Sequence, residues 1–264
     1  MSSTVNVILL AGDRGPDDPL ASHAGVPGKV LVPVAGQAML TRVLVTLVGW
    51  PRLGRVVLLA PAQADYRDAA LASGIESDRL IWVPPAQSPS ASVQAGLEAA
   101  GSDRPVFLLT ADHPLLDSAW LDGLLSAGDT ADLLVGLADW TTVMARFPRG
   151  RRTRYRFRDR SICGTNLFLF RTPEADRMLE VWKQVEASRK KPWKVVALLG
   201  WGNLARYLSG RLRVGEAFAA LSARLGFVVS PTIVDDPLAA VDVDSVADLE
   251  LVSEVLEARG RVCG

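Results

Sequence analysis

The sequence predicts an α/β protein with a doubly wound, mostly parallel sheet. Near-continuous apolar runs recur through the first half of the chain, and helix-like segments separate them. Parallel strands that are covered on both faces read as unbroken apolar runs, whereas half-exposed strands alternate. The chain has 264 residues, of which 49% are hydrophobic, so it can fill a core on both sides of such a sheet.

The first half of the chain supplies the regular part of this pattern. Strands are expected at 5–10, 55–60, 80–83 and 105–110, and helices at 38–48, 64–73 and 90–100. Sheets of this class bind ligands beyond the carboxyl ends of their strands. We therefore expect the loops after Leu10, Val83 and Thr110 to meet at one edge.

The second half is less regular. Strands are expected at 132–138, 166–170, 227–230 and 240–243, and helices at 173–188, 215–225 and 245–258. It contains no repeat, low-complexity tract or clear linker. We expect one domain over residues 1–264, with a less regular acceptor-side or lid subregion at about 140–215 that covers the ligand edge.

Composition excludes several classes of function. Lys+Arg and Asp+Glu both total 29, so the chain as a whole has no general attraction for nucleic acid or for an anionic membrane, and any charge-based function must be local. It has neither a signal-like start nor an apolar stretch of about 18 residues, so we expect a cytoplasmic protein that does not span a membrane. Two cysteines and two histidines are too few for a thiolate or histidine metal site. Any metal must therefore be held by carboxylates.

The stretch LLAGDRGPDDPLASHAGVPGKVLVPVAGQAML, residues 9–40, joins a buried strand to a helix through a Gly/Pro-rich loop that contains one lysine, Lys29. Glycine turns let backbone N–H groups approach phosphates, and a lysine adds positive charge. The stretch is not a Walker A motif, because Val30 follows Lys29. The residues alone leave a phosphate loop and a surface loop equally open.

The same stretch, LLAGDRG followed by PGKVLVPVAGQAMLTRVL, resembles the signature of nucleotidyltransferases with a glycosyltransferase-A-like, Rossmann-like fold. The similarity is greatest to the branch of molybdenum-cofactor guanylyltransferase and methylerythritol-phosphate cytidylyltransferase. Asp13 and Gly28 depart from the family pattern. The resemblance implies that Arg14 and Lys29 act on the phosphates in catalysis. It also implies a nucleotide-binding set of Leu10, Ala11, Gly12, Asp13, Arg14, Gly15 and Lys29.

The stretch SPSASVQAGLEAA, residues 88–100, resembles the base-recognition turn of the cytidylyltransferases. The resemblance implies that Ser88 and Ser92 contact the base, because hydroxyl groups and helix-entry N–H groups offer both donors and acceptors. The alternative is that Ser90 only caps the helix.

Carboxylates at two strand ends predict a Mg²⁺ site. In VFLLTADHPLLD, Asp112 follows a buried strand, and it is the first predicted ligand and a catalytic residue. His113 is expected to be a loop residue. The stretch LAAVDVDSVADLELV resembles a late element of the family, in which Asp242 aligns best with the second ligand. Strand alternation would put Asp244 on the same side, and Asp248 is expected to form a capping box with Ser245.

These elements together imply attack of an acceptor phosphate on the α-phosphate of an NTP. A phosphate nucleophile is already ionised near neutral pH, so the reaction depends on alignment and charge neutralisation and needs no general base. Mg²⁺ on Asp112 and Asp242, with Lys29 and Arg14 on the phosphates, would supply both. In the methylerythritol-phosphate cytidylyltransferases that the chain resembles, a lysine stands at the position of Asp242. The resemblance therefore disfavours that particular activity for this chain.

The acceptor side is indicated by two segments. Arginine recurs at every second residue over 152–160, and a strand there would project the set to one face. Three interpretations of such a face are open: it binds an acceptor phosphate, it contacts anionic lipid headgroups, or it is an ordinary solvated edge. The stretch SICGTNLFLFRTP resembles the acceptor-side strand of the family; the alternative is a turn that enters a buried strand. The acceptor set is Arg156, Arg158, Cys163, Gly164, Thr165 and Asn166.

The leading hypothesis is a Mg²⁺-dependent nucleotidyltransferase that uses CTP rather than GTP. Its acceptor would be a phosphorylated small alcohol, sugar or lipid-headgroup precursor, and nucleic acid is not an expected partner. A GTP-dependent guanylyltransferase of cofactor biosynthesis, a nucleotide-binding module without catalysis, and a membrane-associated interaction protein stay open as alternatives. For the cationic and apolar segment 187–208, peripheral membrane contact, a lid over the acceptor pocket and internal packing are all open.

Overall fold

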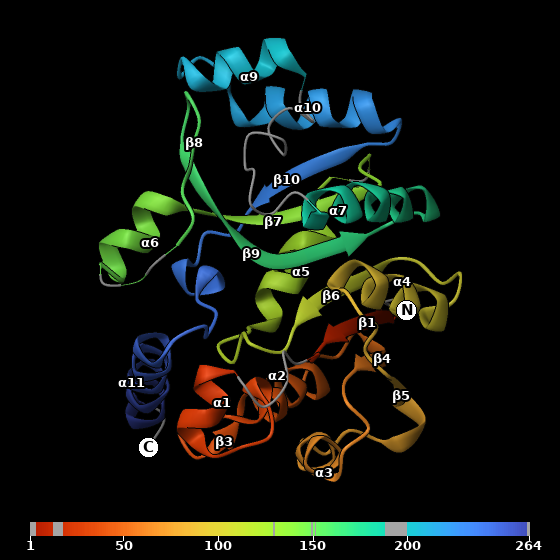
Figure 1. The fold of residues 1–264 in the computed structure, drawn as a ribbon, viewed down its shortest axis with the longest axis vertical. Helices are drawn as coiled ribbons and strands as arrows, with labels where there is room; N and C mark the ends of the chain where they lie inside the picture. Colours follow the sequence, from red (N-terminus) through yellow and green to blue (C-terminus); the bar gives the residue numbers. More distant parts are fainter. Residues whose placement is uncertain are drawn as a thin grey trace.

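An eight-stranded sheet runs through the protein, with the strand order β10-β7-β9-β6-β1-β4-β5 and β8 paired to β9 (Figure 1). The structure is a computed structural model that describes residues 4–12, 18–128, 130–148, 150, 152–187 and 200–262, with 184–187 and 260–262 described by their backbone alone. The strands are β1 (Val5–Leu10), β4 (Leu53–Leu59), β5 (Leu80–Val83), β6 (Val106–Thr110), β7 (Leu133–Asp139), β8 (Tyr155–Arg156), β9 (Ser161–Phe170) and β10 (Val229–Ile233).

The sheet is mostly parallel. β1 pairs in parallel with β4 and β6, β4 with β5, and β7 with β10, whereas β9 runs antiparallel to β6, β7 and β8. The predicted doubly wound α/β class is therefore confirmed. A separate short hairpin joins β2 (Pro33–Val34) to β3 (Gln37–Ala38).

The two faces of the sheet carry separate cores, because alternate residues of each central strand point to opposite sides. On β1, Val7 and Leu9 pack into the core that includes α2 (Met39–Val48) and α5 (Ser118–Ser126). Ile8, between them, packs into the core that includes α4 (Pro89–Ala100) and α7 (Met178–Ala187). This burial on both faces explains why the strand is apolar at every position except Asn6.

Several helices begin at an aspartate or serine cap. Asp18 accepts hydrogen bonds from the first turn of α1, and Ser88 does so for α4. Helix α1 ends at Gly25, whose φ of 66° is the left-handed conformation that glycine adopts readily. The other elements are α1 (Pro19–Ala24), η1 (Lys29–Leu31), α3 (Ala64–Leu71), η2 (Ser77–Arg79), α6 (Trp140–Arg146), η3 (Pro173–Arg177), α9 (Trp201–Leu208), α10 (Val214–Leu225), η4 (Pro237–Ala240) and α11 (Val246–Val262).

Three local expectations differ from the structure. The expected strand at 240–243 is wrong: the amide of Val241 closes a turn on Leu238, and the amide of Val243 donates to Asp112 in the loop after β6, so neither belongs to a ladder. The opening stretch contains α1 and η1 in addition to loop. In the arginine run, only Tyr155–Arg156 is strand, as β8. Among the described residues, no helix has the length and apolarity that a membrane crossing requires.

Candidate functional site

The loops that follow four parallel strands meet at one edge of the sheet. Ala111 donates to the carbonyl of Leu10 at 2.8 Å, and Ala11 donates to Leu59 at 2.9 Å. Ala60 donates in turn to Val83 at 3.2 Å. The predicted meeting of the loops after Leu10, Val83 and Thr110 is therefore confirmed, because each strand end is bonded to its neighbour.

A cavity of about 570 Å³ lies at this edge. One wall comes from the loops after β1 and β6, another from the segment between β5 and α4, and a third from β9 and the chain before α11. The lining residues are Leu10, Gly12, Asp18, Lys29, Val30, Leu59, Pro85, Ala86, Gln87, Ser88, Pro89, Ser92, Thr110, Asp112, Asn166, Asp242 and Asp244.

Lys29 begins η1 and joins the first wall to the acidic side of the cavity. Its Nζ lies 2.8 Å from Oδ2 of Asp112 and also forms an ion pair with Asp244, and its side chain is 16% exposed. Burial opposes the charged ammonium, but the attraction of these two carboxylates outweighs it and raises the pKa of Lys29. Lys29 therefore holds a fixed positive charge inside the cavity.

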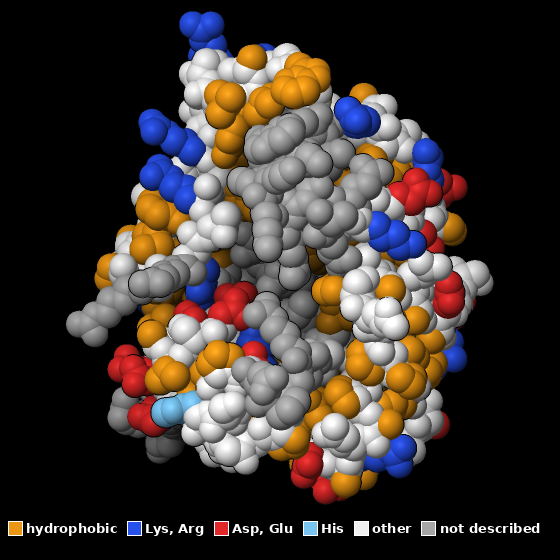
Figure 2. Space-filling view, viewed as in Figure 1, with side chains coloured by type: hydrophobic (Ala, Val, Ile, Leu, Met, Phe, Trp, Pro, Cys, Tyr) orange, Lys and Arg blue, Asp and Glu red, His pale blue; other side chains and the backbone are white. Residues whose placement is uncertain are grey.

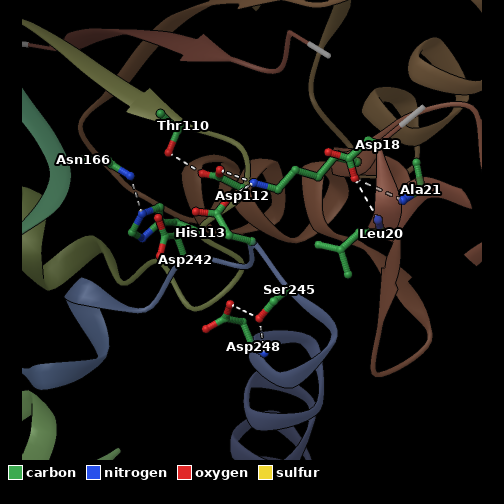
Figure 3. A network of polar contacts seen from close by, with 12 residues as sticks. Asp18, Leu20, Ala21, Thr110, Asp112, His113, Asn166, Asp242, Ser245 and Asp248 are labelled. Atoms are coloured by element: carbon green, nitrogen blue, oxygen red, sulfur yellow. Dashed lines mark hydrogen bonds and ion pairs between the residues drawn. The ribbon is translucent and has the colours of Figure 1, made fainter. Parts of the chain in front are cut away.

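Asp112 is fixed by both its side chain and its backbone (Figure 3). Thr110 donates its hydroxyl to Oδ1 at 2.6 Å, and the amide of Val243 donates to the Asp112 carbonyl at 3.0 Å. Burial would raise the pKa of Asp112, but Lys29, His113 and the two side-chain hydrogen bonds hold it below its ordinary value. Asp112 is therefore a carboxylate near neutral pH.

Three carboxylates converge beside the lysine. Asp112, Asp242 and Asp244 each offer an oxygen, and these oxygens lie within 4.8 Å of one another. Burial, together with the charges of the other two acids, raises the pKa of Asp242 in spite of His113 and Arg152. Lys29 and Arg152, the second of which also pairs with Asp248, do not balance these acids, and hard oxygen donors are what Mg²⁺ prefers. The residues present therefore fit a divalent cation.

Arg152 holds the chain that carries Asp242. Its guanidinium donates to the carbonyl of Ala240 at 2.6 Å, to the carbonyl of Asp242 at 3.1 Å and to Oδ1 of Asp248 at 3.0 Å. The Asp248 carboxylate also accepts from Ser245 at 2.5 Å, at the start of α11, so the expected Ser245–Asp248 cap is present. Arg152 is 9% exposed and does not share an open face with Arg156.

His113 and Asn166 form the side of the cavity that faces β9. His113 is 5% exposed, and its Nε2 lies 3.0 Å from Nδ2 of Asn166. Asn166 has a φ of 55°, which is uncommon for a residue other than glycine, and the β7–β9 register shifts opposite it between Val135 and Leu137. This bulge places an amide in the cavity from a strand that is otherwise buried.

The segment between β5 and α4 forms the wall opposite the acids. Ser88 caps α4 by accepting from the amide of Ala91 at 3.2 Å. Ser92 accepts from the amide of Ala86 at 2.9 Å, which closes the turn that precedes the helix. Ser88, and not Ser90, is the cap, and both predicted base contacts lie on the cavity wall.

The structure brings together most of the nucleotide and metal set and leaves the acceptor set dispersed. Of the acceptor residues, only Asn166 lines the cavity; Cys163 and Thr165 are buried in β9, and Gly164 is exposed. Arg156 and Arg158 are exposed on β8 and the turn after it. Ala11 is buried beside the cavity in the core. The predicted residues Asp13, Arg14 and Gly15 lie outside the described residues.

Among the lining residues that the sequence analysis did not place in the site, three carry a carboxylate or a hydroxyl group: Asp244, Thr110 and Asp18. The sequence indicated Asp244 through its alternation with Asp242, which puts both on one side of a strand. The structure adds that Asp244 forms an ion pair with Lys29. Thr110 is the last residue of β6, and only this position at a strand end indicated it in the sequence. Asp18 reads as a helix cap before Pro19, which it also is.

Comparison with known proteins decides the family. The model of the MobA-like NTP transferase domain matches residues 7–190, which is more than half of the chain. The chain belongs to this family of NTP transferases. In this nucleotidyltransferase the loops after β1 and β6 come together where Lys29 and Asp112 form their ion pair. Among curated protein sequences no relative is found at a significant level.

Solved structures share the fold of this NTP transferase over nearly its whole length. A hypothetical transferase from Thermus thermophilus is 28% identical, with a TM-score of 0.77 over 93% of this chain and 99% of its own. A 4-diphosphocytidyl-2C-methyl-D-erythritol synthase from Anaerococcus prevotii is 11% identical, with a TM-score of 0.59 over 97% of both chains. A CMP:2-keto-3-deoxy-manno-octonic acid synthetase complexed with CTP is 14% identical, with a TM-score of 0.60 over 97% of this chain and 100% of its own.

Proposed function

We propose that this NTP transferase moves CMP from CTP to a phosphorylated small alcohol, sugar or lipid-headgroup precursor and releases pyrophosphate, with Mg²⁺. The observation that carries the proposal is the meeting of Lys29 with Asp112, Asp242 and Asp244 in one cavity of about 570 Å³. A buried lysine among carboxylates provides charge of both signs at the place where a metal-bound triphosphate would lie.

The chain's own residues supply positioning and charge. Lys29 is held between Asp112 and Asp244, so triphosphate oxygens that enter the cavity meet an ammonium whose place is already set. Asp112, Asp242 and Asp244 would hold Mg²⁺, which when bound supplies positive charge against the phosphates. Arg152 keeps the Asp242 backbone in place from behind. The acceptor oxygen then displaces pyrophosphate from the α-phosphorus, and no side chain has to remove a proton.

CTP is favoured over GTP by the fold neighbours and by the wall at Ser88 and Ser92. Two of the similarly folded structures are, by name, a diphosphocytidyl synthase and a CMP-sugar-acid synthetase with CTP. Ser88 and Ser92 keep the turn at Ala86 closed, so a base on this wall would meet hydroxyl and backbone groups at fixed positions. Asn166, with His113 behind it, would receive the acceptor from β9.

The test measures pyrophosphate release with each of the four NTPs against a panel of phosphorylated alcohols and sugars, with and without Mg²⁺. We expect turnover with CTP that requires Mg²⁺. Strict use of GTP would overturn the cytidylyl assignment in favour of a guanylyltransferase. NTP binding without pyrophosphate release, for every combination of NTP and acceptor, would overturn the proposal that the protein catalyses nucleotidyl transfer.

Matched variants locate the chemistry. Asp112→Asn and Lys29→Met are each expected to lower turnover by about 10²–10³-fold, the usual effect of removing one charged stabilising group. Asp235→Asn and Lys183→Met make the same charge changes outside the cavity and are expected to keep wild-type turnover. Equal loss in both pairs would refute the placement of the site.

A further inference from the structure

Helix α9 exposes an apolar face at the end of the molecule. Trp201 is 73% exposed and Leu208 is 76% exposed, and Ala205 between them is also exposed. Spacings of four and three residues put these side chains on one side of a helix. A tryptophan and a leucine that are exposed on the same helix face form an apolar patch, and burying such a patch against a partner is favourable.

The opposite side of α9 is held by the protein. Leu204 is buried, and the ring of Tyr207 packs edge-on against Phe157 at 5.4 Å. The hydroxyl of Tyr207 also accepts from the amide of Arg156 at 3.4 Å. The helix is therefore anchored through its inner face, and the outward position of Trp201 and Leu208 follows from that anchoring.

Exposed arginines lie on α9 and on the segments next to it. The turn after β8 is tied to the end of α9, because the amide of Arg158 donates to the carbonyl of Leu212 at 2.8 Å. The two acids of the described segments 152–160 and 200–216 are both engaged: Asp159 accepts from the amide of Val214, and Glu216 pairs with Arg206 at 2.7 Å. Besides Arg154, which lies over the ring of Trp140, the exposed arginines of these segments are Arg156, Arg158, Arg160, Arg206, Arg211 and Arg213. Figure 2 shows hydrophobic side chains at this end of the molecule with Lys or Arg groups at its margin.

We propose that the α9 face, with its arginine margin, docks the protein on an anionic membrane surface. Tryptophan and leucine enter the headgroup region, and arginines meet lipid phosphates; this combination is typical of helices that lie in the plane of a membrane. The net charge of the whole chain is zero, so the attraction is local to this end. The proposal does not depend on which nucleotide or acceptor the cavity takes.

A second copy of the chain fits this surface less well. In a two-fold dimer each surface meets its own copy, so the arginine margin would face arginines. A stable dimer buries about 800 Å² on each partner. Trp201, Ala205, Leu208 and the half-exposed Tyr155 are a small apolar area by that measure. Charge complementarity therefore favours a negatively charged lipid surface.

The test is co-sedimentation of the full chain with vesicles of phosphatidylcholine mixed with phosphatidylglycerol, and with vesicles of phosphatidylcholine alone. We expect binding to the mixed vesicles that weakens in high salt, with a blue shift of tryptophan emission that Trp201→Phe reduces. Trp201→Ala with Leu208→Ser is expected to weaken binding by about tenfold or more. Arg158→Gln with Arg160→Gln and Arg211→Gln is expected to weaken it about a hundredfold at low salt, since each arginine contributes about fivefold.

Two matched controls distinguish docking through this face from non-specific binding to vesicles. Leu71→Ser removes an apolar side chain that is 57% exposed on α3, and Arg52→Gln with Arg55→Gln and Arg67→Gln removes three arginines elsewhere. Both are expected to bind vesicles like the wild type, and far-UV circular dichroism checks that every variant is folded. Absence of wild-type binding, or equal loss in the controls, overturns the proposal. So does a change of oligomeric state in the Trp201 and Leu208 variant with unchanged vesicle binding, which would assign the face to a second copy.

Discussion

Replacing Arg152 by methionine tests whether this arginine holds the acidic chain in place. Methionine keeps most of the apolar stem but removes donors to Ala240, Asp242 and Asp248. It also leaves the Asp248 carboxylate, which is 9% exposed, without its cation. Breaking one side of a buried ion pair costs about 3–5 kcal/mol. Because the side chain of Asp242 is 22% exposed, the low end of this range applies.

The expected loss in the free energy of unfolding is therefore about 3 kcal/mol, measured by urea titration followed by circular dichroism. In a domain of this size the melting temperature would fall by roughly 6–12 °C. Arg152→Lys keeps the charge but not the planar fork that serves three acceptors, so a loss of about 1–2 kcal/mol is expected.

Arg158→Met is the matched control, because Arg158 belongs to the same alternating arginine run but its side chain is exposed. It is expected to change stability by less than about 0.5 kcal/mol. A loss below about 1 kcal/mol for Arg152→Met, or an equal loss for both variants, would refute the reasoning.

Two further predictions concern packing and burial. Gly96→Ala is expected to destabilise the protein by about 1–2 kcal/mol, because its Cβ would lie 2.7 Å from Ile8 Cγ2, whereas Gly123→Ala, with nothing within 4 Å, should stabilise α5 by about 0.5 kcal/mol. The same sign in both urea titrations would contradict the packing argument. Burial raises the pKa of the Cys163 thiol to about 11, so we expect iodoacetamide to alkylate it at neutral pH only after unfolding, as peptide mass mapping would detect. Rapid labelling of the folded protein at Cys163 would contradict this.

The fold of the first half was predictable because its signals are local. β1 and β6 are buried on both faces, so their sequences are apolar except at Asn6 and Thr110, and the predicted ends agree with the structure to within one residue. Parallel strands in a doubly wound sheet share one ligand edge, so the convergence of Leu10, Thr110 and Asp112 followed from the class alone.

The second half was harder, because its backbone groups find partners far away in the chain. Residues 240–243 alternate like a strand, but Val243 donates to Asp112 in the loop after β6, and within the described part of the chain no strand pairs with them. The conformation of Asn166 depends on the register of β7 against β9, which no local pattern in the sequence encodes.

The stretch at residues 9–40 shows which properties the sequence determines and which depend on the tertiary structure. The sequence by itself determined the chemistry available there: a strand end, a glycine, and one lysine ahead of a helix. Only the tertiary structure decided the partners of Lys29, since Asp112 lies 83 residues away and Asp244 lies 215 residues away. It likewise separated Arg152 from the exposed arginines that follow it. The physical reason is that the charge and the period of a side chain are local properties, whereas its partners and its burial depend on which distant segments the sheet brings to the same edge.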